Sequence, residues 1–434
     1  MLLCVDPATR AWVLTGEDLA LAQRDVRVFD NFTDVEAHSN TLIDPSFPGW
    51  SGAYLAIWKA TAEWGSERHL EGHGDPHQPD DLGSGGANFD ASWQGAAPDS
   101  GGPDDNVMSE IAGNNPGVIA YTETPTGDGW RIRFYRTPWV WFDRPAGQTI
   151  GSLWTDIQGI ATHEYGHALG LGHSFDPNAT MYPVPPTDDV NWRSIEADDR
   201  AGLAAIYGVK LASKPRITTY ELLAGGAVKI TGEHFAPSGN SVWFTQRGVS
   251  ADGVPVKVSG VTSSQAGSEL VVTLPTEAGP GDVLIDNGGA SFADLSNAFP
   301  FDPTRNPCFA PSYYGSSRRN SSGHQAEIYY AGTPSVGTPG FSLILDHAPA
   351  GETAVLFYGA AAADLPFGAG RMWVAVPRVR AVKLTTDVFG AVSTPIAVTP
   401  AMVGETRCYQ WWFSDPTDAH HAGLSKALRV TFCP

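Results

Sequence analysis

The chain has 434 residues, of which 42% are hydrophobic and 17% are charged. This length predicts two to four domains, because a single hydrophobic core rarely grows beyond about 300 residues. The 47 acidic residues outnumber the 27 lysines and arginines and give a formal charge of −20. That charge repels nucleic acid and anionic membrane surfaces, so we expect neither as a partner.

The cysteines and the hydropathy pattern predict a secreted protein. Cys4, Cys308, Cys408 and Cys433 lack the spacing of a zinc finger and favour disulfide bonding in an oxidising compartment. Either Cys308 or Cys408 is a candidate partner for Cys433. No stretch approaches the roughly 20 apolar residues of a membrane span. The start of the chain shows no signal peptide, and we therefore expect a mature or trimmed form of an extracellular protein.

The N-terminal third mixes strand and helix patterns. Val26–Phe29 alternates as a strand does, and residues 53–64 place Ile57, Ala60 and Trp64 on one helical face. Gly65 is expected to end this helix, and Ala87–Trp93 is a predicted strand. Gly117–Thr122 and Trp130–Tyr135 read as two strands of a hairpin, with a glycine-rich turn between them.

An acidic loop between residues 98 and 106 is a candidate calcium site. It carries Asp99, Asp104 and Asp105 among glycines, and flexible loops rich in oxygen ligands can bind calcium. A solvated acidic turn is an equal alternative.

The strongest chemical signal is the run HEYGHALGLGHS. On a helix over about 154–169, His163 and His167 lie one turn apart on one face and can bind one metal ion. A continuing helix would carry His173 to the far side. Gly170, however, can adopt the left-handed conformation that ends a helix and reverses the chain. Three histidine nitrogens with an open fourth position are typical of catalytic zinc.

Two further features follow the histidines. Met181 stands in the run ATMYP, and ordinary core packing is the alternative to any special role for it. A last helix, expected to be capped by Ser194 and ended by Gly208, begins with Asp198 and Asp199.

A metal-free cluster of buried histidines is the alternative to the zinc site. It is disfavoured because the glycine and third histidine at fixed offsets make a chance match much rarer.

The pattern HExxHxxGxxH with a following methionine turn resembles the metzincin signature. Ser174 after the third histidine and the run Ala179–Pro183 are similar to the matrixins, the matrix-metalloproteinase-like peptidases. The resemblance covers about residues 12–208. It implies an α+β catalytic domain of three helices and a small mixed sheet within residues 1–210.

This resemblance also implies a reaction. His163, His167 and His173 would bind one Zn²⁺, and Glu164 would be the general base that activates a zinc-bound water to hydrolyse a peptide bond. Met181 would form a packing floor beneath the metal. The expected activity is that of a zinc-dependent endopeptidase acting on protein or peptide substrates.

Substrate contacts and supporting residues are implied in the same way. An extended peptide would bind as an added strand beside Gly117–Thr122. Asp198 and Asp199 would brace the N-terminus and the methionine turn, unless they form only a solvated helix start. The residues expected to contact substrate are Gly117, Val118, Ile119, Ala120, Tyr182, Pro183, Val184 and Pro185.

Three positions depart from the matrixin pattern. His73-Gly74-Asp75 is similar to part of the structural zinc site, but it precedes the predicted Ala87–Trp93 strand and the other ligands are absent, so we expect a single zinc. Pro185 stands where matrixins usually have a tyrosine lining the pocket for the residue after the scissile bond. Cys4 resembles the cysteine by which the pro-segments of matrixins bind the zinc and keep the enzyme latent, but it lacks the preceding Pro-Arg. The alternative roles for Cys4 are a disulfide or a free thiol.

The rest of the chain shows short alternating runs between glycine and proline turns and no helical period, which predicts two all-β, sandwich-like domains. Residues 214–302 resemble an IPT/TIG domain, an immunoglobulin-like module. Residues 303–434 resemble C-terminal β-rich domains of secreted bacterial proteins and are expected to carry a disulfide. These modules are candidates for binding extracellular protein or glycan. The alternative function is therefore a surface adhesin with a vestigial peptidase domain, which the intact motif disfavours.

Overall fold

The computed structural model describes residues 11–23, 25–41, 44, 46–67, 82–123, 129–143, 154–185, 190–309, 311–337, 340–368 and 370–433. Cys4 and the His73-Gly74-Asp75 run lie outside the described residues, so the expectations for them remain predictions. Residue contacts divide the chain into two compact units. The first is Met1–Thr41, Phe47–Glu71 and Asp75–Pro307, and the second is Cys308–Pro434 with Leu42–Ser46 and Gly72–Gly74.

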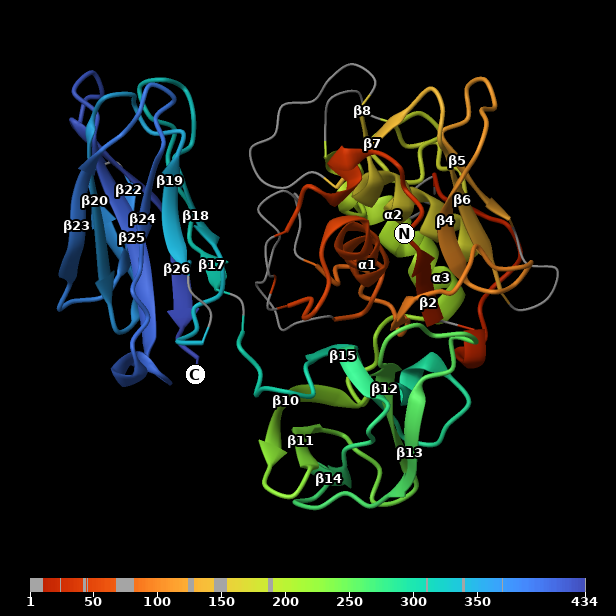
Figure 1. The fold of residues 1–434 in the computed structure, drawn as a ribbon. Helices are drawn as coiled ribbons and strands as arrows, with labels where there is room; N and C mark the ends of the chain where they lie inside the picture. The colour runs from red at the N-terminus through yellow and green to blue at the C-terminus, as the bar shows by residue number, and fades with distance from the viewer. Residues whose placement is uncertain are drawn as a thin grey trace, which may run out of the picture. The chain divides into compact units, whose positions relative to one another are not determined.

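A five-stranded sheet organises the N-terminal half of the first unit, in the order β3-β2-β4-β6-β5. Figure 1 labels β2, β4, β6 and β5 of this sheet. The strands β2, β3, β4 and β6 run parallel to one another, and β5 is antiparallel to β6, which makes the sheet mixed as predicted. The two edges of the sheet are therefore β3 and β5. The strands are β2 (Asp25–Phe29), β3 (Ser92–Ala96), β4 (Val107–Ile111), β5 (Ala120–Glu123) and β6 (Arg131–Tyr135).

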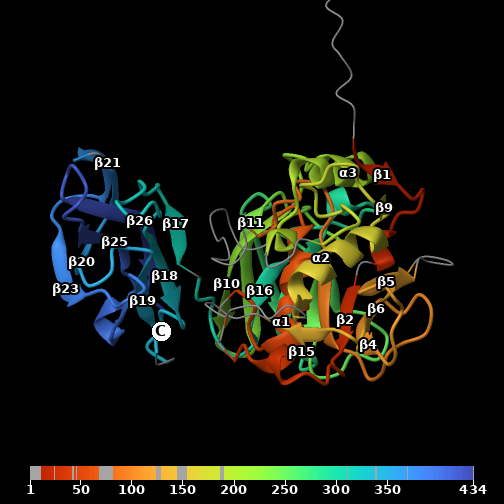
Figure 2. The same cartoon turned by 90° about the horizontal axis from the view of Figure 1, so that it is seen from above.

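Three α-helices occur among the described residues: α1 (Gly52–Glu63), α2 (Ile157–Ala168) and α3 (Ala197–Tyr207). Helices α1 and α2 pack against each other and share one buried core with the sheet (Figures 1 and 2). Ile57, Ala60 and Trp64 are fully buried, which confirms the predicted inner face of the first helix. No described helix is long and apolar enough to cross a membrane.

Several predicted boundaries were wrong. The strand expected at Ala87–Trp93 starts only at Ser92, and the strand expected at Gly117 starts at Ala120. Ala87 instead pairs with Val209 in an isolated bridge. This bridge holds the segment before β3 against the chain that follows α3. That segment therefore cannot extend β3 within the sheet.

The predicted starts of α2 and α3 also needed correction. Trp154–Asp156 is a strand, β8, which pairs in parallel with β7 (Val140–Phe142). The Asp156 carboxylate then caps α2 by accepting a hydrogen bond from Gly159 N at 3.0 Å. The N-cap of α3 is Glu196 rather than Ser194, because the Glu196 and Asp199 side chains form a reciprocal capping box.

The remaining short elements of this part are β1 (Val13–Leu14), β9 (Leu171–Gly172) and the 3₁₀ turns Leu21–Gln23, Val35–His38 and Asn191–Arg193. β1 pairs with β9 immediately before His173.

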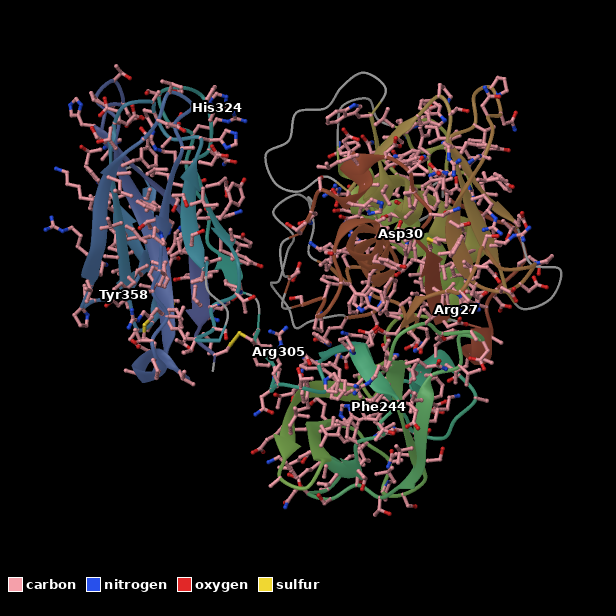
Figure 3. The ribbon with its side chains drawn as sticks, viewed as in Figure 1. Arg27, Asp30, Phe244, Arg305, His324 and Tyr358 are labelled. Carbon is pink, nitrogen blue, oxygen red and sulfur yellow. A yellow bond between two sulfur atoms is a disulfide. The ribbon has the colours of Figure 1, made fainter. Side chains whose placement is uncertain are left out.

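Residues 216–301 form two antiparallel sheets, β10-β11-β14 and β13-β12-β15-β16. Tyr220 contacts Phe301 at a ring separation of 4.9 Å, and Phe301 contacts Phe244 at 5.0 Å, so aromatic rings join the sheets. Phe244 is labelled in Figure 3. The elements are β10 (Arg216–Leu223), β11 (Ala227–Glu233), β12 (Asn240–Gln246), β13 (Val256–Val261), β14 (Glu269–Thr273), β15 (Ala278–Asp286), β16 (Phe299–Phe301) and the 3₁₀ turn Phe292–Asp294.

These two sheets belong to the same compact unit as the five-stranded sheet and cover its β3 edge. Trp93 N donates to Asp282 Oδ2 at 3.2 Å, and Trp93 O accepts from Thr245 Oγ1 at 2.7 Å. Ala96 O accepts from Ser250 N at 2.8 Å. The edge strand thus has hydrogen-bond partners on both sides.

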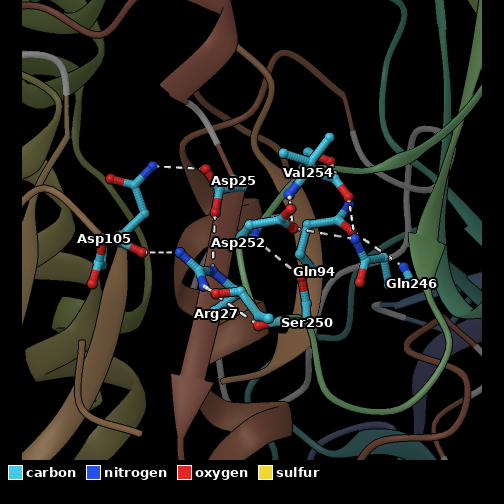
Figure 4. A network of polar contacts seen from close by, with 12 residues as sticks. Asp25, Arg27, Gln94, Asp105, Gln246, Ser250, Asp252 and Val254 are labelled. Carbon is cyan, nitrogen blue, oxygen red and sulfur yellow. Dashed lines mark hydrogen bonds and ion pairs between the residues drawn. The ribbon is translucent and has the colours of Figure 1, made fainter. Parts of the chain in front are cut away.

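Two buried cations strengthen this junction. Arg27, on β2, donates to Asp25 and to the carbonyls of Asp105, Ser250 and Ala251 (Figure 4). It therefore ties the five-stranded sheet to the β12–β13 loop.

Lys214 is the second cation, at the start of the β-rich segment. Its ammonium lies 3.0 Å from Asp90 Oδ2. It also donates to Asn88 O at 2.7 Å, to Phe292 O at 2.7 Å and to Leu295 O. One side chain therefore joins segments on both sides of the boundary expected near residue 214.

The second unit is all-β. It contains the sheets β17-β26-β25-β20-β23 and β18-β19-β24 and the hairpin β21-β22. One cluster of buried residues is shared by the two larger sheets. The elements are β17 (Ser312–Tyr314), β18 (Glu327–Ala331), β19 (Ser342–Asp346), β20 (Thr353–Gly359), β21 (Ala362–Phe367), β22 (Gly370–Val374), β23 (Val379–Thr385), β24 (Val392–Pro395), β25 (Thr406–Ser414), β26 (Ala422–Thr431) and the 3₁₀ turn Pro400–Met402.

The disulfide in this unit joins Cys308 to Cys433 (Figure 3). Cys408, the other candidate partner, is buried and free.

Candidate active site

Helix α2 brings the first two histidines of the motif together. The rings of His163 and His167 lie 4.9 Å apart, and those of His167 and His173 lie 4.8 Å apart. One nitrogen from each histidine lies within 4.8 Å of the other two. Nitrogens that share one zinc at about 2.1 Å each are at most about 4.2 Å apart, so the spacing of the three nitrogens is close to what one ion requires.

The third histidine reaches the site because the helix stops where predicted. Helix α2 ends at Ala168, and Gly170 has a φ of +100°. A Cβ at Gly170 would lie 2.1 Å from Glu17 O, so the position excludes a side chain on both conformational and steric grounds. The reversal leads into β9, which pairs with β1 and leads directly to His173.

Hydrogen bonds orient the two helical imidazoles. His163 Nδ1 lies 2.6 Å from Thr180 O, and His167 Nδ1 lies 2.8 Å from Leu171 O. Because a carbonyl can only accept, each Nδ1 must carry the proton and each Nε2 is left as the ligand atom. The donor set therefore fits a metal ion.

Burial also favours the ligand form of these rings. It lowers the pKa of His163 to about 3, with a smaller contribution from His167. Burial lowers the pKa of His167 and His173 as well. Neutral imidazoles are the form that binds metal.

Glu164 lies between the two helical histidines in sequence, and its side chain is buried. Burial raises the pKa of Glu164 to about 7, and a hydrogen bond from Thr122 opposes that rise. Thr122, on β5, donates to Glu164 Oε2 at 2.9 Å.

A tryptophan covers one face of the site. The Trp192 indole stacks on the His163 imidazole at 4.4 Å with an angle of 10° between the rings. The next residue, Arg193, donates to both oxygens of Asp156 at 2.6 and 2.7 Å. The N-cap of α2 thus fixes the turn that carries Trp192.

Met181 packs against the underside of α2. A Cβ at Gly166 would lie 2.3 Å from Met181 Sδ and 2.8 Å from the Trp64 ring. This contact explains why the residue after Tyr165 in the motif is glycine. Met181 N donates to Asp199 Oδ1 at 3.1 Å, which fixes the turn from the α3 side.

The paired aspartates of α3 act as the braces that the resemblance implied. Asp199 accepts from Thr180 N at 2.8 Å, in addition to the bond from Met181. Asp198 accepts from Trp12 N at 3.0 Å and from Ser174 Oγ at 2.6 Å. The alternative of a solvated helix start is therefore wrong for both residues.

Comparison with known proteins supports the resemblance to the matrixins. The matrixin family model matches residues 68–208. Residues 68–208 form a matrixin domain. Human matrilysin is 41% identical over 76 residues, covering 17% of this chain and 28% of matrilysin. The metalloendoproteinase 4-MMP of Arabidopsis thaliana is 36% identical over 110 residues, covering 25% of this chain and 29% of that protein.

The similarity is limited in extent. Human neutrophil collagenase is 48% identical over 56 residues, which is 13% of this chain and 12% of the collagenase. The chain thus spans less than a third of each of these relatives. A solved structure of a repeat region from a large adhesion protein aligns with 49% of this chain and 48% of that protein's chain, at 13% identity. The TM-score of 0.17 supports no argument from this alignment.

Not every expected substrate residue lies on β5, the edge strand opposite β3. Ala120 is the first residue of β5, whereas Gly117–Ile119 precede it. Ile119 O accepts from Tyr135 N at 3.0 Å, and Val118 O accepts from Trp139 Nε1 at 3.4 Å. Tyr182, Pro183, Val184 and Pro185 follow the methionine turn as irregular backbone, and contact of these residues with substrate stays a prediction.

The three aspartates predicted to bind calcium do not form a cluster of ligands among the described residues. Asp99 and Asp105 accept hydrogen bonds from Gly101 N and Gly102 N, and Asp104 has a φ of +65°. Arg131 donates to Gly101 O at 2.6 Å, so a guanidinium already uses a loop carbonyl. In the described part of the chain, only the three histidines form a group of three or more His, Cys, Asp or Glu side chains that could hold a metal ion.

Two contacts of the site were missed at the sequence level, those of Thr122 and Trp192. The alternation of β5 would have placed Thr122 on the same face as Ala120, which is buried. No sequence signal indicated that Trp192 would stack on a histidine.

Proposed function

We propose that the protein is a zinc-dependent endopeptidase. The observation that carries this proposal is the convergence of His163, His167 and His173, with the buried Glu164 on the same helix as the first two. The matrixin match over residues 68–208 supports the same reaction class.

Bound zinc would supply Lewis-acid chemistry, polarising a carbonyl and acidifying water. The chain itself supplies proton transfer. The Glu164 carboxylate would accept a proton from the attacking water and donate it to the nitrogen of the leaving amine. The hydrogen-bonded Nδ1 atoms of His163 and His167 would keep both Nε2 atoms directed to the metal during this exchange.

The β5 edge is the proposed binding site for the peptide. It is the edge opposite β3, and β3 is covered by the β-rich segment that follows. An extended substrate would pair with the main chain of Ala120–Glu123, a mode in which backbone bonds contribute affinity and side-chain pockets contribute specificity. Tyr182–Pro185 would contribute to these pockets.

The proposed setting is extracellular, with protein or peptide substrates. The Cys308–Cys433 disulfide supports it, because disulfides persist in oxidising compartments. We also propose that the β-rich segments bind extracellular protein or glycan and that the chain binds calcium. Neither proposal is carried by a contact described above.

The test is hydrolysis of a mixed-peptide library, read by mass spectrometry. Wild type should cleave the library, and Glu164→Ala should lower the rate by about a hundredfold or more, the usual range for loss of an acid–base group. Glu221→Ala removes a half-exposed carboxylate on β10 and should leave the rate unchanged.

Metal dependence forms the second arm. A chelator should abolish hydrolysis, and added zinc should restore it. Zinc content should be about one ion per chain in wild type and in Glu164→Ala and should fall in His163→Ala. Equal activity in all samples would overturn the peptidase proposal.

A further inference from the structure

Thr122 contacts the proposed general base at two points. Its Oγ1 lies 2.7 Å from Glu164 O and 2.9 Å from Glu164 Oε2. Thr122 belongs to β5, 42 residues earlier in the chain. The sheet edge and the catalytic helix therefore meet at this hydroxyl.

The two contacts restrict how the glutamate can point. A threonine hydroxyl has one proton, which these two acceptors share. A glutamate side chain has three rotatable bonds and would otherwise sample several rotamers. Because one hydroxyl contacts both the backbone oxygen and the carboxylate, any rotamer that moves the carboxylate away from Thr122 Oγ1 loses this hydrogen bond. The contact therefore favours rotamers that keep the carboxylate beside β5.

We propose that Thr122 is a positioning residue for the reaction, holding the Glu164 carboxylate where it can exchange a proton with the attacking water. This inference rests on the proposed peptidase function. Thr122 would act through Glu164 and would not itself touch the reacting atoms.

The geometry separates this role from substrate binding. Side chains alternate across a strand, and the hydroxyl of Thr122 faces α2. The backbone of β5 would pair with substrate along the strand edge, in the sheet plane. Loss of the hydroxyl should therefore lower kcat and leave KM nearly unchanged, because binding groups would stay in place.

The experiment compares three variants of the full chain. Thr122→Val keeps the shape and the strand preference but removes the hydroxyl. Thr122→Ser keeps the hydroxyl. Thr162→Val is the matched control, because the Thr162 hydroxyl bonds Gln158 O within α2 at 2.9 Å.

We expect kcat to fall about tenfold to a hundredfold in Thr122→Val, the size expected for one lost hydrogen bond to a charged group. KM, zinc content and the thermal midpoint should change little. Thr122→Ser should retain kcat within about threefold and Thr162→Val within about twofold. Unchanged kcat in Thr122→Val, or an equal loss in Thr122→Ser, would overturn the proposal.

A spectroscopic readout separates this proposal from the peptidase function. The infrared carboxylate bands of Glu164 can be isolated as wild type minus Glu164→Gln. They should shift in Thr122→Val and stay in place in Thr122→Ser, and an unshifted band in Thr122→Val would overturn the contact. If wild type cleaves no peptide, the peptidase function fails together with the catalytic role of Thr122, whereas a band shift would still establish the contact.

Discussion

Replacement of Lys214 by methionine tests how strongly the two halves of the first unit depend on each other. Methionine retains most of the apolar stem and removes the ammonium. The Asp90 carboxylate would keep the hydrogen bond from Ser66 Oγ at 2.6 Å and a hydrogen bond with the backbone of Ala298, and would lose its counter-ion. The carbonyls of Asn88, Phe292 and Leu295 would each lose a donor.

The expected loss of stability is large. Breaking a buried ion pair on one side typically costs about 3–5 kcal/mol, because the remaining charge stays buried without its counter-ion. We therefore expect Lys214→Met to lower the free energy of unfolding of the first unit by about 3–5 kcal/mol. Adding Asp90→Asn should recover part of this loss, because no charge then remains buried.

The loss should depend on pH in a defined direction. Burial raises the pKa of Asp90 to about 6, against the lowering effect of Lys214. Because the pKa of Asp90 is raised in the folded state, its contribution to the free energy of unfolding is fully present below about pH 4. That contribution is lost as the pH rises through about 6. Without the ammonium the pKa of Asp90 rises further. The deficit of the variant should therefore be smaller at pH 5 than at pH 8.

The assay is pulse proteolysis over a urea series at both pH values, with fragments of the first unit identified by mass spectrometry. Lys210→Met is the matched control, since Lys210 is half-exposed and pairs with Glu67 at 3.5 Å. Its loss should be below about 1 kcal/mol. A loss below about 1 kcal/mol for Lys214→Met, or one equal at pH 5 and pH 8, would refute the reasoning.

Three further predictions concern the active site and the second unit. Gly170→Ala places a Cβ 2.1 Å from Glu17 O and should lower stability by about 2–4 kcal/mol together with zinc content; Gly113→Ala, at a similar φ in open space, controls for backbone strain. Trp192→Ala removes the ring stacked on the first histidine and should weaken zinc binding about tenfold in a chelator competition, whereas Trp192→Phe should retain it. Cys308→Ser opens a loop closed over 125 residues and should cost the second unit about 2–5 kcal/mol in thermal unfolding without changing peptide hydrolysis.

The parts of the site that follow from local spacing were predictable. His163 and His167 lie one helical turn apart in any α-helix, and Gly170 marks the reversal by its lack of a Cβ. The strands after residue 215 were recognisable because alternation with a period of two is also local. Val242–Phe244, for example, lies within β12.

The contacts that join distant segments were not predictable from spacing. Thr122 and Glu164 are 42 residues apart, and nothing in either segment encodes their meeting. The start of β3 was misplaced because Ala87 pairs with Val209, a partner 122 residues away. The cap of α3 depends on which of several polar side chains folds back onto the helix, and Glu196 does so instead of Ser194.

The covered β3 edge has a consequence for cutting the chain into parts. An exposed sheet edge is a template for pairing with another molecule and a common route to aggregation. Here Asp282, Thr245 and Ser250 take the hydrogen bonds of that edge. A fragment that stops before residue 214 would keep the three histidines and yet have two open edges, so copies of it could pair with one another at β3. With β3 covered by the β-rich segment, β5 is the edge at which we propose that a substrate strand is added.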